Sequence, residues 1–300
     1  MSIDHTDPLN ATKPELSRRG FVALGAGAAA AASSAAAANA QSEGFGKPHA
    51  PIVAEDDSMI VTSRPRLMPN AGGPILAYAA MPRMVTPRTP GIVVVQHIWG
   101  VDATIRDTVR RYAKNGFIAI APELFGRLSA PSGDGMTDYQ PFIAFATKMT
   151  AQGFVTTDIL AAHDWIRTQA RDAAVGITGF CMGGGIALQQ IIDSKGYGAC
   201  SMFYGSVRPG TKSDDPTTPT TFDFTSRITT PLMGSFGARD TSIKPDDVRA
   251  MFARLTVPHD LKIYDEAGHA FFDDTRESYV PSAAADAWTR TLAWFKKYLT

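Results

Sequence analysis

From residue 58 onward the chain alternates short apolar runs with amphipathic segments, and this alternation restricts the folds that it can adopt. The run from Gly91 to Gln96 is rich in β-branched residues, which is typical of a parallel strand buried on both faces. Similar runs predict strands at residues 75–81, 117–121, 174–179, 199–204, 231–236 and 259–264, and the segments between them predict helices at 103–115, 156–170, 245–255 and 281–299, with another starting near Met182. Strands that alternate with helices need a mostly parallel sheet covered on both faces. We therefore predict a doubly wound α/β fold in a single domain.

The first forty residues are typical of an export signal rather than of a folded segment. The pair Arg18-Arg19 precedes an apolar stretch rich in Ala and Gly, which ends in Ala38-Asn39-Ala40. A charged region, an apolar region and an A-x-A site indicate a secretory signal, and paired arginines indicate the twin-arginine type. A transmembrane helix is the alternative, but Ala and Gly are weakly apolar residues for a membrane span. We predict a signal over residues 1–40, a polar linker outside any core over 41–57, and a folded domain over 58–300 that is periplasmic or secreted, without a membrane anchor after signal removal.

Charge and cysteine content argue against several classes of protein. The chain has 29 basic and 29 acidic residues and no long Lys/Arg run, so we expect no nucleic-acid partner. Its two cysteines, Cys181 and Cys200, are too few for a disulfide scaffold or a four-cysteine zinc site. The sequence contains neither C-x-x-C nor H-E-x-x-H, which disfavours a thiol redox protein and a metallohydrolase. Cys200 lies in an apolar run and is expected to be buried.

The most specific motif is a glycine-rich turn after the strand predicted at residues 174–179. It reads Gly179-Phe180-Cys181-Met182-Gly183, a G-x-S-x-G nucleophile elbow with cysteine in place of serine. In such an elbow a strand turns sharply into a helix, and small neighbours prevent clashes between the two. The nucleophile then lies at a helix N-terminus, where backbone N–H groups favour a thiolate. A turn that simply buries its cysteine is the alternative, and a phosphate loop fits less well because no Gly-Lys-Ser/Thr follows.

A cysteine nucleophile needs a base and a carboxylate that orients the base. His269 follows the last predicted strand, and loops after parallel strands meet at one rim of the sheet. Asp240 follows the strand predicted at 231–236 and lies between the cysteine and the histidine in the chain, as the elbow pattern requires. The competing carboxylates are Asp246, Asp247, Asp265 and Glu266, and the histidines considered structural or superficial are His163 and His259. We predict a triad of Cys181, His269 and Asp240.

Taken together, these segments resemble the dienelactone hydrolase family of α/β-hydrolases. The resemblance covers nearly the whole mature domain, and it includes the segments 96–101, 105–107, 116–125, 179–184, 237–240 and 266–271. It implies an α/β-hydrolase fold and hydrolysis of a small ester or lactone through a thioacyl-enzyme, with no metal and no organic cofactor. It also implies an oxyanion hole formed by the backbone N–H groups of Ile98 and Met182.

Two departures from the family pattern concern the substrate and the nucleophile. Where family members that process dienelactone have a glutamate, this chain has His97, and we expect His97 either to pair with the Cys181 thiolate or to point away and leave His269 as the only base. Simple packing of His97 against its loop is the alternative. Family members bind the carboxylate of their substrate with arginines that line the cleft, whereas this chain has Asp273 four residues after His269. We therefore expect the substrate to be an uncharged ester or lactone. The residues expected at the substrate pocket are Trp99, Arg127 and Phe271.

Two other functions agree with the same sequence. The triad would also serve a broader esterase, peptidase or thioesterase, which rates on a panel of activated esters, lactones and thioesters would distinguish. The fold could also belong to a catalytically silent exported binding protein, in which no small ester would acylate Cys181. The sequence does not predict an oligomeric state.

Overall fold

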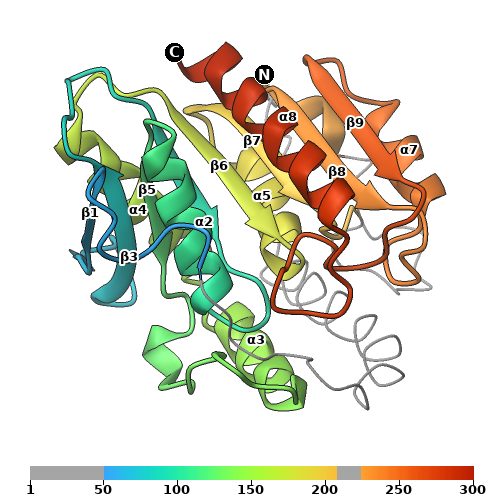
Figure 1. Ribbon diagram of the computed structural model, residues 1–300, viewed down its shortest axis with the longest axis horizontal. Helices are drawn as coiled ribbons and strands as arrows, with labels where there is room; N and C mark the ends of the chain where they lie inside the picture. The colour runs from blue at the N-terminus through green and yellow to red at the C-terminus, as the bar shows by residue number, and fades with distance from the viewer. Residues whose placement is uncertain (1–50, 208–223) are drawn as a thin grey trace, which may run out of the picture.

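A computed structural model describes residues 51–207 and 224–300. In this part of the chain a nine-stranded sheet has the order β1-β3-β5-β4-β6-β7-β8-β9, with β2 pairing to β3 (Figure 1). The strands are β1 (Ile60–Ser63), β2 (Arg66–Leu67), β3 (Ile75–Pro82), β4 (Gly91–Val95), β5 (Ile118–Pro122), β6 (Val175–Phe180), β7 (Tyr197–Phe203), β8 (Leu232–Gly237) and β9 (His259–Tyr264). The α-helices are α2 (Ala103–Lys114), α3 (Gln140–Gln152), α4 (Val155–Gln169), α5 (Met182–Asp193), α7 (Pro245–Phe252) and α8 (Pro281–Leu299), and the 3₁₀ turns are η1 (Gly126–Leu128) and η2 (Thr225–Arg227).

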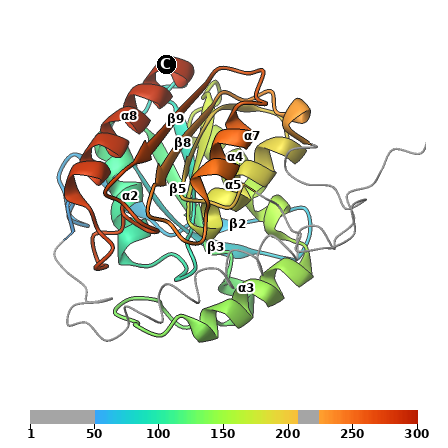
Figure 2. The ribbon, with the colours of Figure 1, turned by 90° about the vertical axis from the view of Figure 1, so that its right-hand side faces the viewer.

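The neighbouring strands β5, β4, β6, β7, β8 and β9 pair in parallel. Strands β1, β2 and β3 extend the sheet by antiparallel pairing. Helices α2 and α8 cover one face of the sheet, while α4, α5 and α7 cover the other (Figure 2). Every residue of β4 and β6 is buried, as expected for strands covered on both faces. The predicted single-domain α/β fold with a mostly parallel, doubly wound sheet is therefore confirmed.

The carboxyl ends of parallel strands lie at one edge of the sheet, and the loops at this edge contain the residues predicted for the site. His97 follows β4, Cys181 follows β6, Asp240 follows β8 and His269 follows β9. Residues from four distant parts of the sequence are thereby brought to one rim. The loop after β9 then leads into α8, which begins at Pro281.

Two strands and one α-helix of the described chain were not predicted from the sequence. Strands β1 and β2 are only four and two residues long, too short for an alternating pattern to stand out. Helix α3 buries Phe142, Ala146 and Met149 at helical spacing, but its exposed residues mix apolar and polar side chains and weaken that pattern. No helix within the described ranges is both long and apolar enough to cross a membrane.

Val53 departs from the prediction that residues 41–57 form a linker outside the core. Val53 is buried, its N–H donates to Asp107 Oδ1 at 2.9 Å, and its carbonyl accepts from Arg110 Nε at 2.6 Å. Arg110 also pairs with Glu55 at 2.7 Å. The polar composition hid this packing because the partners lie on α2, more than fifty residues away. Residues 41–50 and the predicted signal at 1–40 lie outside the described residues.

Candidate active site

The turn between β6 and α5 has the geometry of a nucleophile elbow. Cys181 adopts φ +54° and ψ −118°, a backbone conformation that costs energy in a non-glycine residue. A Cβ on Gly179 would lie 2.0 Å from the Gly183 carbonyl oxygen, and one on Gly183 would lie 2.4 Å from the Gln96 carbonyl oxygen. Only glycine fits at these two positions. The strand–turn–helix context that was predicted for the motif is present.

Cys181, His269 and Asp240 form a continuous chain of hydrogen bonds. The Cys181 Sγ lies 3.0 Å from His269 Nε2, and His269 Nδ1 lies 2.8 Å from Asp240 Oδ2. The other carboxylate oxygen, Asp240 Oδ1, accepts the backbone N–H groups of Ser242 at 2.8 Å and Ile243 at 2.9 Å. The imidazole therefore lies within hydrogen-bonding distance of both the thiol and the fixed carboxylate, which is the arrangement that a cysteine nucleophile, its base and an orienting carboxylate require.

The competing carboxylates do not occupy the orienting position. Asp246, Asp265 and Glu266 have exposed side chains, and Asp246 lies near Arg249 at 3.7 Å. Asp247 lies in the first turn of α7, the place that its sequence position suggested. The buried carboxylate that contacts His269 is Asp240.

The surroundings of Cys181 and His269 favour an ion pair between a thiolate and an imidazolium. Burial raises the pKa of the Cys181 thiol, but the charge of His269 and its hydrogen bond outweigh burial, so the net pKa is lowered. Burial lowers the pKa of His269, but the thiolate and the Asp240 carboxylate outweigh it and bring this pKa well above its ordinary value. By contrast, burial raises the pKa of Cys200, which is completely buried and has no such partner. The two free cysteines thus differ strongly in expected reactivity.

His97 does not pair directly with the thiolate, so this part of the prediction is wrong. Its Nε2 lies 2.8 Å from Asp102 Oδ1, a close ion pair without the alignment of a hydrogen bond, and its Nδ1 lies 3.6 Å from Asp273 Oδ2. Two carboxylates attract the imidazole more strongly than one thiolate does, and together they raise the pKa of His97 despite its burial. His97 nevertheless lines the same cavity as Cys181, and its charge lowers the pKa of the thiol through space.

A cavity of about 480 Å³ opens at Cys181 and His269. Ile98 and Trp99 line it, together with Tyr204, whose ring packs edge-on against the His269 imidazole with 5.3 Å between ring centres. Tyr204 has a strained φ of +36°. Met182 begins α5 beside the nucleophile, and its backbone N–H helps to lower the pKa of Cys181. Ile98 and Met182 thus lie beside Cys181, and their role as an oxyanion hole stays a prediction.

Two residues expected at the pocket lie elsewhere. Arg127 forms an ion pair with Asp158 and donates to the carbonyl oxygens of Gly72 and Gly73, both at 2.7 Å, so it fastens a surface segment. Phe271 is completely buried and packs against the rings of Tyr204 and Tyr264, behind the cavity wall. Neither side chain lines the cavity, because one is held by a carboxylate and the other belongs to the core.

The sequence did not reveal two charged residues of the cavity region, Asp102 and Arg276. Asp102 caps α2 by accepting the Ile105 N–H at 3.1 Å, and an aspartate ahead of a helix is a recognisable cap. Its ion pair with His97 could not be predicted from the sequence, because it depends on how the fold places the two side chains. Arg276 lies on the loop after β9, with its guanidinium 4.1 Å from the centre of the Trp99 ring. Within residues 51–207 and 224–300, no group of three His, Cys, Asp or Glu side chains is placed to hold a metal ion.

Several known proteins are similar to this chain in sequence and fold. Residues 75–299 match the model of the dienelactone hydrolase family. A candidate carboxymethylenebutenolidase of Escherichia coli is 32% identical over 266 residues, covering 86% of this chain and 96% of the relative, and one of Salmonella typhimurium is 31% identical over 255 residues, covering 84% and 93%. The crystal structure of a candidate dienelactone hydrolase from Klebsiella pneumoniae is similar with a TM-score of 0.71 and 32% identity, and covers 80% of this chain and 99% of that one.

Proposed function

This chain belongs to the dienelactone hydrolase family of lactone and ester hydrolases, and we propose that it cleaves a small ester or lactone through a thioacyl-enzyme formed on Cys181. The observation that carries the proposal is the alignment of Cys181, His269 and Asp240, with separations of 3.0 and 2.8 Å, at the wall of a cavity. A cavity of about 480 Å³ is within the usual range for a small-molecule site.

In the first half of the reaction the Cys181 thiolate attacks the carbonyl carbon of the substrate. The carbonyl electron pair moves onto oxygen, and the backbone N–H groups of Ile98 and Met182 stabilise the negative charge. When the intermediate collapses, the carbon–oxygen bond breaks and the leaving alkoxide takes the Nε2 proton of His269. An ester releases its alcohol at this point, whereas a lactone remains attached as a ring-opened hydroxyacyl group.

In the second half His269 acts as a general base. Neutral Nε2 removes a proton from water as the oxygen attacks the thioester carbon, and Cys181 leaves as a thiolate. The products are a carboxylic acid and the restored thiolate–imidazolium pair. Asp240 holds Nδ1 protonated throughout, so Nε2 is always the atom that exchanges protons with the substrate or water.

Intact-mass measurement of a trapped acyl group tests the proposal. His269→Ala removes the base needed for deacylation, and it also removes the imidazolium that stabilises the thiolate, so the trapping is done at alkaline pH, where the thiol ionises without it. Under these conditions an activated lactone should add its full mass once per chain, and peptide mapping should place it on Cys181. Cys200 is the internal control, because its complete burial should leave it unmodified. If folded wild-type and variant proteins gain no adduct and hydrolyse no ester, lactone or thioester, the chain is a silent binding protein rather than this hydrolase.

We also propose that the protein is exported by the twin-arginine route to the periplasm or the medium. The support is the sequence Arg18-Arg19 followed by an apolar stretch and Ala38-Asn39-Ala40. In a bacterial host, the mature chain should appear outside the cytoplasm and begin at Gln41. Replacing both arginines with lysine should keep the precursor inside the cell, and Lys13→Arg is the matched control. Export that persists in the double-lysine variant would contradict this route.

A further inference from the structure

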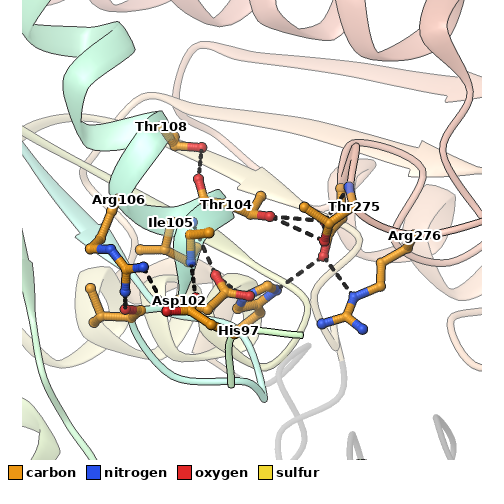
Figure 3. Close-up of polar contacts among 12 residues, drawn as sticks. His97, Asp102, Thr104, Ile105, Arg106, Thr108, Thr275 and Arg276 are labelled. Atoms are coloured by element: carbon orange, nitrogen blue, oxygen red, sulfur yellow. Dashed lines mark hydrogen bonds and ion pairs between the residues drawn. The ribbon is translucent and has the colours of Figure 1, made fainter. Parts of the chain in front are cut away.

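Four charged side chains form a buried cluster at the wall of the cavity. They are His97, Asp102, Asp273 and Arg276, each less than one-tenth exposed. Figure 3 shows His97 beside Asp102 at the start of α2, and Thr275 and Arg276 on the loop that faces them. The cluster thus joins the loop after β4 to the loop after β9. Three of its members, His97, Asp273 and Arg276, line the cavity that contains Cys181.

Asp273 is the centre of this cluster. Its Oδ1 accepts the Thr275 hydroxyl at 2.7 Å, the Thr275 N–H at 3.1 Å and the Thr104 hydroxyl at 3.0 Å. Its Oδ2 lies 3.6 Å from His97 Nδ1 and 3.5 Å from Arg276 Nε. One oxygen is therefore anchored by hydroxyl and backbone donors, while the other lies between two cations.

The described cluster balances its own charges. Both ring nitrogens of His97 face carboxylates, which favours the doubly protonated imidazolium. His97 and Arg276 then contribute two positive charges, and Asp102 and Asp273 contribute two negative charges. Arg276 is also held over Trp99 at 4.1 Å and donates from Nη1 to the Met136 carbonyl at 2.9 Å. A buried charge that lacks a compensating partner is costly, so a further negative charge beside this cluster is unfavourable.

The other charged residues that line the cavity do not alter this balance. Arg239 is exposed, and its Nε donates to the Asp265 carbonyl at 3.1 Å. Glu266 and Glu277 are exposed acidic side chains of the same cavity. Among the exposed charged residues that line the described cavity, the two acidic side chains thus outnumber the single basic one.

We propose that Asp273 is the specificity-determining residue of this hydrolase: by neutralising Arg276 and His97, it makes the cavity accept uncharged acyl groups and reject acyl groups that carry a second carboxylate. The proposal rests on the hydrolase function proposed above. Loss of the Asp273 charge would leave the described cluster with one net positive charge at the cavity wall. The same cavity would then favour an anionic acyl group.

A matched pair of substrates tests the proposal. Phenyl hexanoate and the phenyl half-ester of adipic acid differ only by the terminal carboxylate, and the quantity measured is the ratio of kcat/KM for the anionic ester to that for the neutral one. The wild-type ratio should be below about 0.1, as one unfavourable charge contact is expected to reduce it at least tenfold. Asp273→Asn should raise the ratio about tenfold or more, whereas Asp273→Glu, which keeps the charge, should stay near the wild-type value.

Arg276→Gln in the Asp273→Asn background should remove the gain, because it removes the cation that Asp273 faces in the wild type. A wild-type enzyme that prefers the anionic ester would overturn the proposal, and this result does not depend on any variant folding. An unchanged ratio in a folded Asp273→Asn protein would overturn it as well. In both cases hydrolysis of phenyl hexanoate would still support the proposed function, whereas absence of hydrolysis and of any Cys181 adduct would contradict that function itself.

Discussion

Replacing His269 with glutamine is expected to lower kcat/KM for esters by about 10⁴-fold, because general base and general acid are lost together. In the wild type, His269 Nε2 lies 3.0 Å from the Cys181 sulfur. Glutamine in its place can neither take the Cys181 proton nor carry a positive charge beside the sulfur. The decisive second measurement is the rate at which iodoacetamide alkylates Cys181 as a function of pH. This rate reports the thiolate and does not require turnover.

The sign of the change in reactivity follows from the two pKa shifts. In the wild type, His269 lowers the pKa of Cys181 and the thiolate raises the pKa of His269, so the ion pair persists from the lowered thiol pKa up to the raised imidazole pKa. Without the imidazolium, burial is opposed only by the charge of His97 and the Met182 N–H, so the thiol pKa should return toward its ordinary value. At pH 6.5 a thiol with an ordinary pKa is roughly 1% ionised, so alkylation should fall by roughly 100-fold.

The control for this measurement is His163→Gln. His163 lies on α4 and contacts Asp164 and the ring of Tyr197, away from the cavity. It should change neither kcat/KM nor the alkylation profile by more than about twofold. If His269→Gln and the wild type have identical alkylation profiles, the ion pair is not what activates Cys181.

Asp240→Asn is expected to lower kcat by roughly 10³–10⁴-fold through the wrong tautomer of His269. The two backbone N–H groups of Ser242 and Ile243 fix an acceptor at the Oδ1 position. The asparagine oxygen must therefore occupy that position, and its NH₂ group must face His269 Nδ1. Nδ1 then becomes an acceptor and the proton moves to Nε2, which can no longer take a proton from Cys181 or water.

Asp265→Asn is the matched control, because it removes an exposed carboxylate close to His269 in sequence. It should alter kcat by less than about twofold. Thermal unfolding of both variants should be measured alongside, so that a folded Asp240→Asn protein can be compared directly with the wild type. A folded Asp240→Asn enzyme with near-normal kcat would show that Asp240 does not orient the base.

The central sheet, and the meeting of Cys181, Asp240 and His269 at one edge of it, could be predicted from the sequence for physical reasons. Buried parallel strands such as β4 have long β-branched runs, and the rule that their carboxyl ends meet at one edge places Cys181, Asp240 and His269 together without any knowledge of distances. The predicted positions of strand β9 and helix α8 agree with the structure to the residue. The elbow was predictable because only glycine fits its neighbouring positions.

What the sequence did not predict depends on contacts between distant segments. The packing of Val53 under α2 and the partners of His97 are set by side chains far away in the chain. Arg127 was expected at the pocket from its charge alone, but its position is decided by Asp158. Phe271 follows His269 by only two residues, yet the direction of the backbone turns its ring into the core. Proximity in sequence does not determine which way a side chain points.

The double role of Asp102 restricts how this protein can diverge. For a helix start alone, serine, threonine and asparagine are as suitable as aspartate. Here the same carboxylate also stands 2.8 Å from the His97 imidazole, so a neutral capping residue such as serine or asparagine would still cap α2 but would leave His97 with Asp273 as its single described counterion. Substitution of Asp102 is thus limited by the charge balance of the cavity wall rather than by helix capping. A designer who chose this residue for its capping preference alone would disturb that charge balance.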